Sequence, residues 1–221
     1  MKKAVVLLSG GLDSSTALYF AKRKGYDCHC LIFDYGQRHK REVQAAKNVA
    51  RSARCRFKLI KISLPWKGSS LLDKKIALPS RKAPGQSPIP STYVPGRNTI
   101  FLSFALSYAE AAGAGHIFIG ANAIDYSGYP DCRPRYFSVF NALSRLATRR
   151  GVEGRAIKIE TPLIGLTKAR IIELGLRLGV PYEATWSCYK GGKKPCGTCD
   201  SCVLRAKGFR EAGVKDPLSA T

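Results

Sequence analysis

Lys3-Ala4-Val5-Val6-Leu7-Leu8 runs directly into Ser9-Gly10-Gly11-Leu12-Asp13-Ser14-Ser15 near the beginning of this 221-residue sequence. The apolar run predicts a buried strand, and the residues after it predict a glycine turn and then a helix over about residues 13–24. Glycines at such a turn let the backbone approach a phosphate closely, and the helix N-terminus presents unpaired N–H groups. The hydroxyl groups of Ser9, Ser14 and Ser15 add donors, so we assign residues 9–15 to phosphate binding.

Residues 9–15 can be compared with two other kinds of segment. A Walker A loop requires Gly-x-x-x-x-Gly-Lys-Ser/Thr, and this segment has neither that spacing nor its lysine. The segment is also compatible with a plain strand-to-helix turn in which Asp13 caps the helix. The Ser-Gly-Gly-x-Asp-Ser order at this position favours the phosphate loop over a plain turn.

The rest of the chain alternates between apolar strand patterns and helix patterns. The periodicity predicts strands over residues 3–8, 28–34, 57–62, 116–120 and 156–160. It predicts helices over residues 13–24, 38–54, 98–114, 135–150 and 167–178. Such alternation is typical of an α/β fold in which a doubly wound parallel sheet carries helices on both faces.

The predicted domains follow from this pattern and from the cysteines near the C-terminus. Residues 1–182 are assigned to the α/β domain, and residues 183–221 to a small cysteine-rich subdomain. Residues 63–96 contain six prolines and no regular pattern. A loop of that length in a compact domain is usually functional, so we expect it to form a lid.

Four cysteines near the C-terminus have the spacing C-x7-C-x2-C-x2-C and comprise Cys188, Cys196, Cys199 and Cys202. Four thiolates gathered by tight turns suit tetrahedral zinc, and because no ligand position stays vacant, that zinc would be structural. Neighbouring lysines at 190, 193 and 194 would offset the negative charge. The C-x2-C-x2-C part also occurs in ferredoxins, so an iron–sulfur cluster and unligated thiols remain alternatives.

Three polar segments follow predicted strands or precede a predicted helix, at residues 34–39, 94–98 and 120–134. The carboxyl ends of parallel strands meet at one edge of a sheet, which is where open α/β sheets bind ligands. We therefore expect the three segments to form one site. Asn98, at the end of the segment 94–98, is also a candidate cap of the helix that follows.

Residues 9–15 resemble the pyrophosphate loop of the N-type ATP pyrophosphatases, whose fold is adenine-nucleotide alpha-hydrolase-like and which cleave ATP to AMP and pyrophosphate. Residues 185–189, Thr-Trp-Ser-Cys-Tyr, and residues 195–202, Pro-Cys-Gly-Thr-Cys-Asp-Ser-Cys, extend the likeness. Together with the strand-end segments, they make the chain similar, nearly end to end, to the 7-cyano-7-deazaguanine synthase family of queuosine biosynthesis.

This resemblance implies a specific reaction and a specific site. The family converts 7-carboxy-7-deazaguanine, ammonia and ATP into a nitrile, through an adenylated carboxylate and then an adenylated amide. Zinc is held by the four cysteines, and magnesium accompanies ATP. The residues expected to bind the deazapurine are Tyr35, Gln37, Arg38, His39, Asp125, Tyr126, Asp131 and Arg133. Arg97 and Asn98 are expected to bind ATP together with residues 9–15. The residues expected to be catalytic are Asp13, Ser14, Asp131 and Arg133.

Two positions depart from the family pattern, because Arg135 and Arg170 stand where acidic residues are expected. They leave room for a related enzyme that modifies tRNA or joins a deazaguanine to a macromolecular amine. A third reading is a zinc-ribbon interaction module with an inactive nucleotide fold. The intact segment 9–15 weighs against that module.

The chain is strongly basic, with 37 Lys and Arg against 15 Asp and Glu and a formal net charge of +22. Within the predicted helix 38–54, one face carries a basic stripe, which we define as Lys40, Lys47, Arg51 and Arg54. The opposite face is apolar and should be buried. Such a stripe can follow a phosphate backbone, so we expect non-specific RNA contact, although a solvated surface explains it equally well.

The sequence also bears on compartment and assembly. No apolar run approaches the ~20 residues that cross a bilayer, so no membrane contact is expected. The apolar run at residues 4–8 is too short for a signal peptide. We therefore expect a cytoplasmic protein with reduced cysteines. A homodimer is a candidate assembly that no pattern in the sequence decides.

Overall fold

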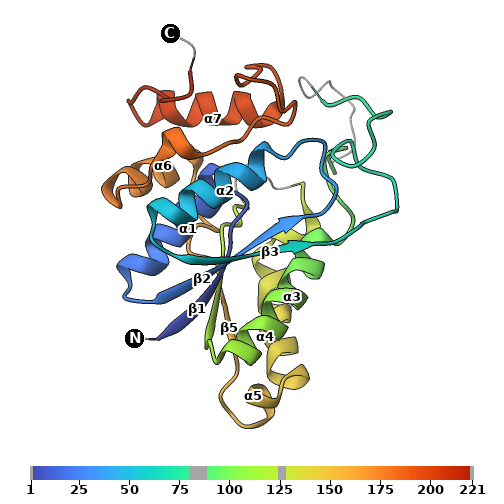
Figure 1. The fold of residues 1–221 in the computed structure, drawn as a ribbon, viewed down its shortest axis with the longest axis vertical. Coiled ribbons are helices and arrows are strands. Elements are labelled where there is room, and N and C mark those ends of the chain that lie inside the picture. The colour runs from blue at the N-terminus through green and yellow to red at the C-terminus, as the bar shows by residue number, and fades with distance from the viewer. Residues whose placement is uncertain (1, 80–88, 124–127, 220–221) are drawn as a thin grey trace.

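The computed structural model describes residues 2–79, 89–123 and 128–219, arranged around a parallel sheet (Figure 1). The order along the sheet is β3-β2-β1-β4-β5. The strand bounds are β1 Lys3–Leu7, β2 Asp27–Asp34, β3 Arg56–Lys61, β4 His116–Ile119 and β5 Lys158–Glu160. All five strands predicted from the sequence are confirmed, and every neighbouring pair is parallel. The order reverses between β1 and β4, which creates a switch point where such sheets bind ligands.

Helices cover both faces of the sheet because successive strand residues point in opposite directions. In β1, Val5 and Leu7 pack with α3 (Arg97–Ala112) and α4 (Pro134–Ala147). Ala4 and Val6 pack on the other face, with α1 (Leu12–Arg23) and α2 (Arg41–Ser52). Figure 1 shows these two helical layers on either side of the strands. The doubly wound α/β fold predicted from the sequence is confirmed.

Two details of the helix prediction are wrong. The helix predicted over residues 135–150 ends at Ala147, because Thr148 is extended and its Oγ1 accepts a 2.9 Å hydrogen bond from the Gly151 amide. That bond starts a short helix, α5 (Arg149–Val152). Asn98 is not the cap of α3, because Gly96 occupies that position with φ +61°. Asn98 lies inside the first turn and is buried.

The C-terminal part adds α6 (Lys168–Arg177) and a helix that the sequence pattern did not predict, α7 (Asp200–Glu211). α7 packs against α6, with Phe209 in a core shared with Ile171. Arg205 of α7 is buried, pairs with Asp216 at 2.8 Å and donates to the Thr185 hydroxyl at 2.7 Å. The boundary proposed at residue 182 stays a prediction.

The proline-rich segment 63–96 is described only up to residue 79 and from residue 89 onward. Its described parts hold each other, because the Ser70 amide donates to the Ser91 carbonyl at 2.8 Å. Leu64 and Leu71 are buried in the core beneath α3. Part of the predicted lid lies outside the described residues, and its role as a lid stays a prediction.

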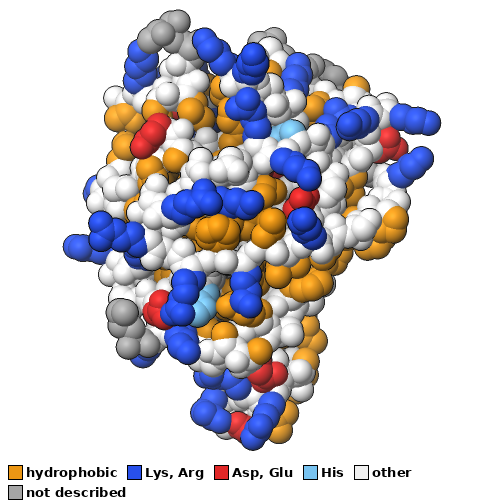
Figure 2. All heavy atoms as spheres, viewed as in Figure 1, with side chains coloured by type: hydrophobic (Ala, Val, Ile, Leu, Met, Phe, Trp, Pro, Cys, Tyr) orange, Lys and Arg blue, Asp and Glu red, His pale blue; other side chains and the backbone are white. Residues whose placement is uncertain are grey.

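The basic helix α2 is amphipathic as expected. Val43, Ala46 and Ala50 are buried against the sheet. Lys40, Arg51 and Arg54 of the basic stripe are exposed, whereas Lys47 is half-buried. Figure 2 shows Lys and Arg side chains spread over this face of the molecule, with few acidic groups among them. In the described ranges, no helix has the length and hydropathy needed to span a bilayer.

Candidate active site and metal centre

A cavity of about 250 Å³ opens at the carboxyl ends of β1, β2 and β4, at the switch point of the sheet. The end of β1, the first turn of α1, the start of α3 and the segment after α6 all contribute to its wall. Nine of the predicted site residues meet there. Those lining the cavity are Ser9, Gly11, Leu12, Asp13, Ser14, Tyr35, Gln37, Arg97 and Asn98.

Two glycines allow the loop at residues 9–15 to pack this closely. Gly10 has φ +81°, and a Cβ there would lie 2.4 Å from the Ala46 nitrogen and 2.5 Å from the Glu42 carbonyl oxygen. A Cβ on Gly120, just after β4, would lie 2.7 Å from the backbone of Asp13. Because real Cβ atoms do not approach backbone so closely, any side chain at either position would displace the loop or its neighbours.

The serine hydroxyls of the loop form a connected set. The Ser9 and Ser14 hydroxyl oxygens lie 3.0 Å apart, and the Ser9 amide donates to Ser14 Oγ at 3.2 Å. Ser15 is fully buried and donates to the Gly11 carbonyl at 2.8 Å, so it braces the turn from behind. Among the described residues, no side chain caps α1, which begins after Gly11. The N-terminus of α1 therefore faces the cavity without a side-chain oxygen occupying it.

Asp13 is held by a lysine that the sequence analysis did not assign to the site. Lys168, the first residue of α6, places its Nζ 2.8 Å and 2.7 Å from the two carboxylate oxygens of Asp13. Both residues line the cavity, and the Lys168 side chain is only 8% exposed. The capping role considered for Asp13 is thus wrong, since its carboxylate pairs with this ammonium group. Lys168 reaches the loop from 155 residues away, so no local pattern points to it.

A second cluster lies where β2, α2 and α3 approach the cavity. Arg97 Nη1 lies 3.4 Å from the Tyr35 hydroxyl, and its guanidinium lies over the rings of Tyr35 and Phe101. Burial raises the pKa of Tyr35. Glu42, which the sequence analysis also missed, lines the same wall, and burial raises the pKa of its carboxyl to about 7 although Arg97 opposes the shift.

The remaining predicted residues occupy other places. Asp131 is buried and its carboxylate accepts the Asn98 amide at 3.0 Å, which fixes the start of α3. Arg133 is exposed at the start of α4. Arg38 turns away to donate to the Asp73 and Ile76 carbonyls of the proline-rich segment. His39 packs against Gly191, and burial lowers its pKa. Asp125 and Tyr126 lie outside the described residues.

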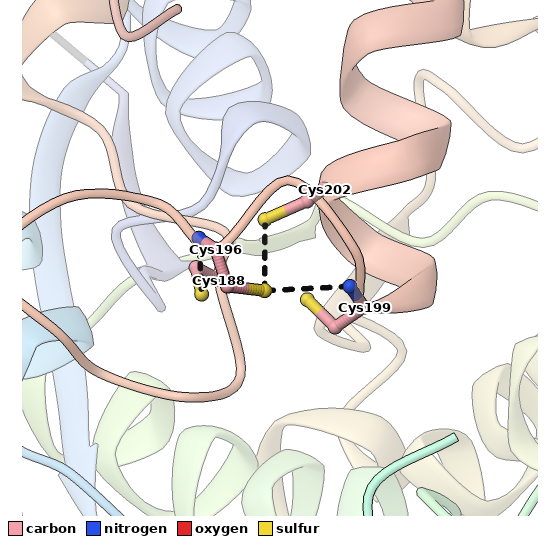
Figure 3. A group of neighbouring side chains, drawn as sticks. All are labelled: Cys188, Cys196, Cys199 and Cys202. Atoms are coloured by element: carbon pink, nitrogen blue, oxygen red, sulfur yellow. Dashed lines mark hydrogen bonds between the residues drawn. The ribbon is translucent and has the colours of Figure 1, made fainter. Parts of the chain in front are cut away.

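The four cysteines converge on one point near the start of α7 (Figure 3). All four Sγ atoms lie within 4.8 Å of one another, and Cys196 and Cys202 Sγ are 4.0 Å apart. Zn–S bonds of about 2.3 Å in a tetrahedron place sulfurs roughly 3.8 Å apart, so the cluster fits a metal of this kind. The Cys196 and Cys199 amides donate to Cys188 Sγ and Cys196 Sγ at 3.4 and 3.3 Å, which favours thiolates.

The four-cysteine cluster is joined directly to the loop at residues 9–15. The Trp186 amide donates to the Gly10 carbonyl at 2.8 Å, and its indole Nε1 donates to the Cys188 carbonyl at 2.9 Å. Arg41 of α2 covers the Trp186 ring at 4.9 Å. Tyr189, next to the first cysteine ligand, lines the cavity. The cysteine segment therefore forms one wall of the cavity.

Solved structures with a similar fold include a predicted subunit of a tRNA methyltransferase from Methanocaldococcus jannaschii, at 16% identity and TM-score 0.51 over 100% of this chain and 93% of that one. A 4-thiouridine synthetase, solved with RNA and bound ATP, matches at 22% identity and TM-score 0.54 over 95% of this chain and 53% of that one. At these identities the likeness concerns the fold alone.

Sequence relatives are much closer. The 7-cyano-7-deazaguanine synthase of Thermoplasma acidophilum is 56% identical over 98% of this chain and 91% of its own length. That of Trichodesmium erythraeum is 55% identical over 98% of this chain and 99% of its own. The model of the family described as queuosine biosynthesis protein QueC matches residues 3–213. The loop at the switch point, the cavity behind it and the four-cysteine centre are therefore those of a chain that belongs to the QueC family.

Proposed function

We propose that this chain is an ATP-dependent ligase that converts 7-carboxy-7-deazaguanine and ammonia into 7-cyano-7-deazaguanine. The observation that carries the proposal is the identity of 56% to a synthase of that name over 98% of the chain. The site supports it, because a glycine–serine loop lies at a helix N-terminus beside a cavity that can take a planar base.

The first half of the proposed reaction makes an amide. A carboxylate oxygen of the substrate attacks the α-phosphorus of ATP, and pyrophosphate leaves. Ammonia then attacks the acyl carbon, AMP leaves with the former carboxylate oxygen, and the nitrogen loses a proton. We assign the departing pyrophosphate to residues 9–15, where the backbone N–H groups of α1 and the hydroxyls of Ser9 and Ser14 can stabilise its charge.

The second half turns the amide into the nitrile. The amide oxygen attacks the α-phosphorus of a second ATP, and pyrophosphate leaves again. Loss of AMP and of the remaining protons from nitrogen gives the carbon–nitrogen triple bond. Lys168, paired with Asp13 at the loop, places a positive charge beside the phosphates in both halves. Magnesium bound to ATP would neutralise further phosphate charge.

The deazapurine is assigned to the wall formed by Tyr35, Gln37, Arg97 and Phe101. A flat base can stack there against aromatic rings, and the guanidinium of Arg97 can meet the substrate carboxylate. Asp131 takes a positioning role in this proposal, since it holds Asn98 and the start of α3. The substrate contacts of Arg38, His39, Asp125, Tyr126 and Arg133 stay predictions.

We assign a structural zinc ion to Cys188, Cys196, Cys199 and Cys202. Four thiolates leave a tetrahedral ion no vacant position for chemistry, so the ion would fix the wall that contains Trp186 and Tyr189. The same four sulfurs can hold an iron–sulfur cluster, which elemental analysis separates from zinc. The cytoplasm is the proposed compartment, because there the thiols remain reduced and available to a metal.

Two further contacts are proposed without a role in the reaction. The exposed members of the basic stripe on α2 support non-specific RNA binding. A homodimer is supported by Val139, Leu143 and Leu146, which are exposed apolar residues on one face of α4. Sedimentation velocity of the wild type and of a Leu146→Glu variant tests the dimer. A wild type that sediments as a monomer at micromolar concentration would remove it.

One assay tests the proposed function against its rivals. Purified enzyme is given ATP and 7-carboxy-7-deazaguanine, with either ammonium chloride or tRNA, and the products are identified by mass spectrometry. We expect the nitrile, AMP and pyrophosphate with ammonium alone. Modified tRNA without a free nitrile would favour the macromolecular acceptor, and Arg135 and Arg170 would then be examined first. No AMP under any condition would favour the inactive module.

A further inference from the structure

The carboxylate of Glu42 lies at the wall of the cavity, and the packing of the fold does not explain why an acidic residue stands there. It lies in the first turn of α2 and lines the cavity. Asp13, the other carboxylate on the cavity wall, is neutralised by Lys168. Among the described residues, none forms a hydrogen bond or an ion pair with the Glu42 carboxylate, although the chain carries 37 basic residues. Glu42 is half-buried, and a carboxylate that is partly withdrawn from water without a partner costs folding free energy, which is typical of a group kept for function.

The surroundings of Glu42 leave it able to exchange protons. Burial raises its pKa to about 7, and the positive charge of Arg97 lowers it only in part. Tyr35 faces it beside Arg97. The other charged or titratable groups around the cavity are the Asp13–Lys168 pair, Arg205 bound to Asp216, Tyr129, Tyr189 and Cys132. Of the charged groups around the cavity, only Arg97 shifts the pKa of Glu42, whereas the charge of Glu42 helps to raise the pKa of Tyr35.

The proposed reaction needs such a group, and the following inference rests on that proposed function. Ammonia is present in neutral water mainly as ammonium, which has no lone pair for attack. Four protons must leave this nitrogen before it becomes the nitrile nitrogen: one to free the lone pair, one after attack on the acyl adenylate, and two as the adenylated amide loses AMP. A general base with a pKa near the working pH accelerates such steps most.

We propose that Glu42 is the catalytic base that takes these protons from the nitrogen. In each step the Glu42 carboxylate accepts one proton, and the electron pair of the broken N–H bond stays on nitrogen. The carboxyl group then releases the proton to water. The adenylation of the substrate carboxylate needs no proton transfer from nitrogen. Glu42 therefore acts after pyrophosphate has left, and this order separates its role from that of the phosphate loop.

The test compares two partial reactions in the full-length protein. Exchange of labelled pyrophosphate into ATP, with 7-carboxy-7-deazaguanine and without ammonium, reports adenylation alone. In Glu42→Gln we expect this exchange within about 3-fold of wild type, whereas nitrile formation with ammonium falls by about 10²-fold or more. Glu211→Gln, which removes an exposed carboxylate on α7, is the matched control and should change neither reaction.

The pH dependence of nitrile formation distinguishes a catalytic base from a residue with a purely structural role, because a structural role would leave that dependence unchanged. In the wild type, nitrile formation should rise with pH through a pKa of about 7, because Glu42 must lose its proton to act. Ammonium also loses a proton as the pH rises, and this affects both proteins equally. The ratio of the wild-type rate to the Glu42→Gln rate therefore isolates the pH dependence that Glu42 contributes. We expect the ratio to fall toward one at low pH.

Each outcome decides between the claims. If Glu42→Gln forms nitrile at the wild-type rate, or loses exchange and nitrile formation equally, Glu42 is not the base. If Glu42→Gln does not fold, Glu42→Ala with added formate takes its place, and failure of formate to restore any nitrile formation overturns the proposal. If the wild type itself shows neither exchange nor nitrile formation, the proposed function fails and the role of Glu42 fails with it, whereas an active wild type beside an unaffected Glu42→Gln overturns the role of Glu42 alone.

Discussion

At the scale of single residues, the Asp13–Lys168 ion pair stabilises the fold and also holds a positive charge at the wall of the cavity. Lys168 is buried at the start of α6, and both carboxylate oxygens of Asp13 contact its Nζ. Removing one partner leaves the other charge buried and uncompensated, which is more costly than removing both. The pair thus ties the phosphate loop to α6, while Lys168 remains a cation at the wall of the cavity.

Asp13→Ala is expected to lower the free energy of unfolding by about 3 kcal/mol, because it leaves the Lys168 ammonium group unpaired. The double variant Asp13→Ala/Lys168→Met should regain most of that loss. Urea denaturation of the two single variants and the double variant measures the coupling. A double variant whose loss equals the sum of the two single losses would mean that the pair contributes nothing to stability.

Ser14→Ala is a cleaner probe of the chemistry, since it removes a hydroxyl without leaving a buried charge. Ser14 Oγ contacts Ser9 Oγ and accepts the Ser9 amide. We expect AMP formation to fall by about 10²-fold through lost stabilisation of pyrophosphate. The unfolding free energy should fall by only about 1 kcal/mol. Ser138→Ala, at an exposed position on α4, is the control. If both variants lose activity equally, Ser14 has no specific role in the site.

The residues that sequence reasoning found and missed differ in a physical way. Ser9 to Ser15 are contiguous, so their order alone shows the loop. Glu42 and Lys168 come from the first turns of two other helices, and they meet the loop only because the sheet order brings those helix ends to the switch point. A single acid in a basic helix, and a lysine at the first turn of a helix, are the only signals the sequence offers for them.

At the scale of elements, two sides of α2 carry residues with different proposed roles. Its first turn points Glu42 into the cavity, whereas its exposed side carries Lys40, Arg51 and Arg54. Lys40 lies only two residues before Glu42 and is left unchanged, whereas Arg51 and Arg54 lie nine and twelve residues after it. Reversal of Arg51 and Arg54 to Glu should weaken tRNA binding and flatten its salt dependence, since fewer counterions are released. Turnover of the free base should stay within about 3-fold of wild type, because screened charges beyond ~8 Å couple weakly. Filter binding at several salt concentrations measures the first effect.

The same variant can contradict the assignment in two ways. Unchanged tRNA binding would mean that the basic stripe is a solvated face. Loss of free-base turnover in a folded protein would mean that the stripe borders the active site. Lys47 is left unchanged because it is half-buried, and Arg41 because its guanidinium covers Trp186.

The sequence predicts the boundaries of elements correctly where hydrophobic periodicity determines them. The prediction fails where a single hydrogen bond determines where a helix ends. The five strands follow from apolar runs. The break at Thr148 depends on one side-chain oxygen that accepts the Gly151 amide, and α7 depends on cysteines at its start that are brought together by tertiary contacts. Helical patterning in α7 is weak because Arg205 is buried through ion pairing and not through hydrophobicity.

At the scale of the whole molecule, the four-cysteine cluster and the cavity at the switch point share one wall. We expect about one zinc ion per chain and Cys199→Ser to loosen residues 187–211, because thiolate ligation is coupled to folding. Through the bond from Trp186 to the Gly10 carbonyl, the variant should also show a raised KM for ATP. Elemental analysis, hydrogen exchange and steady-state kinetics test these points. Iron with acid-labile sulfide, or full activity without metal, would contradict them.

The bond between Trp186 and Gly10 also has a consequence for how the protein is made. It joins the beginning of the chain to a residue near its end, and Lys168 reaches Asp13 across a similar distance. A growing chain on the ribosome can assemble β1, β2 and α1 early, since domains fold from the N-terminal side during synthesis. It cannot complete the nucleotide site until the cysteine segment has emerged. A truncated translation product would therefore carry the phosphate-loop sequence without hydrolysing ATP wastefully.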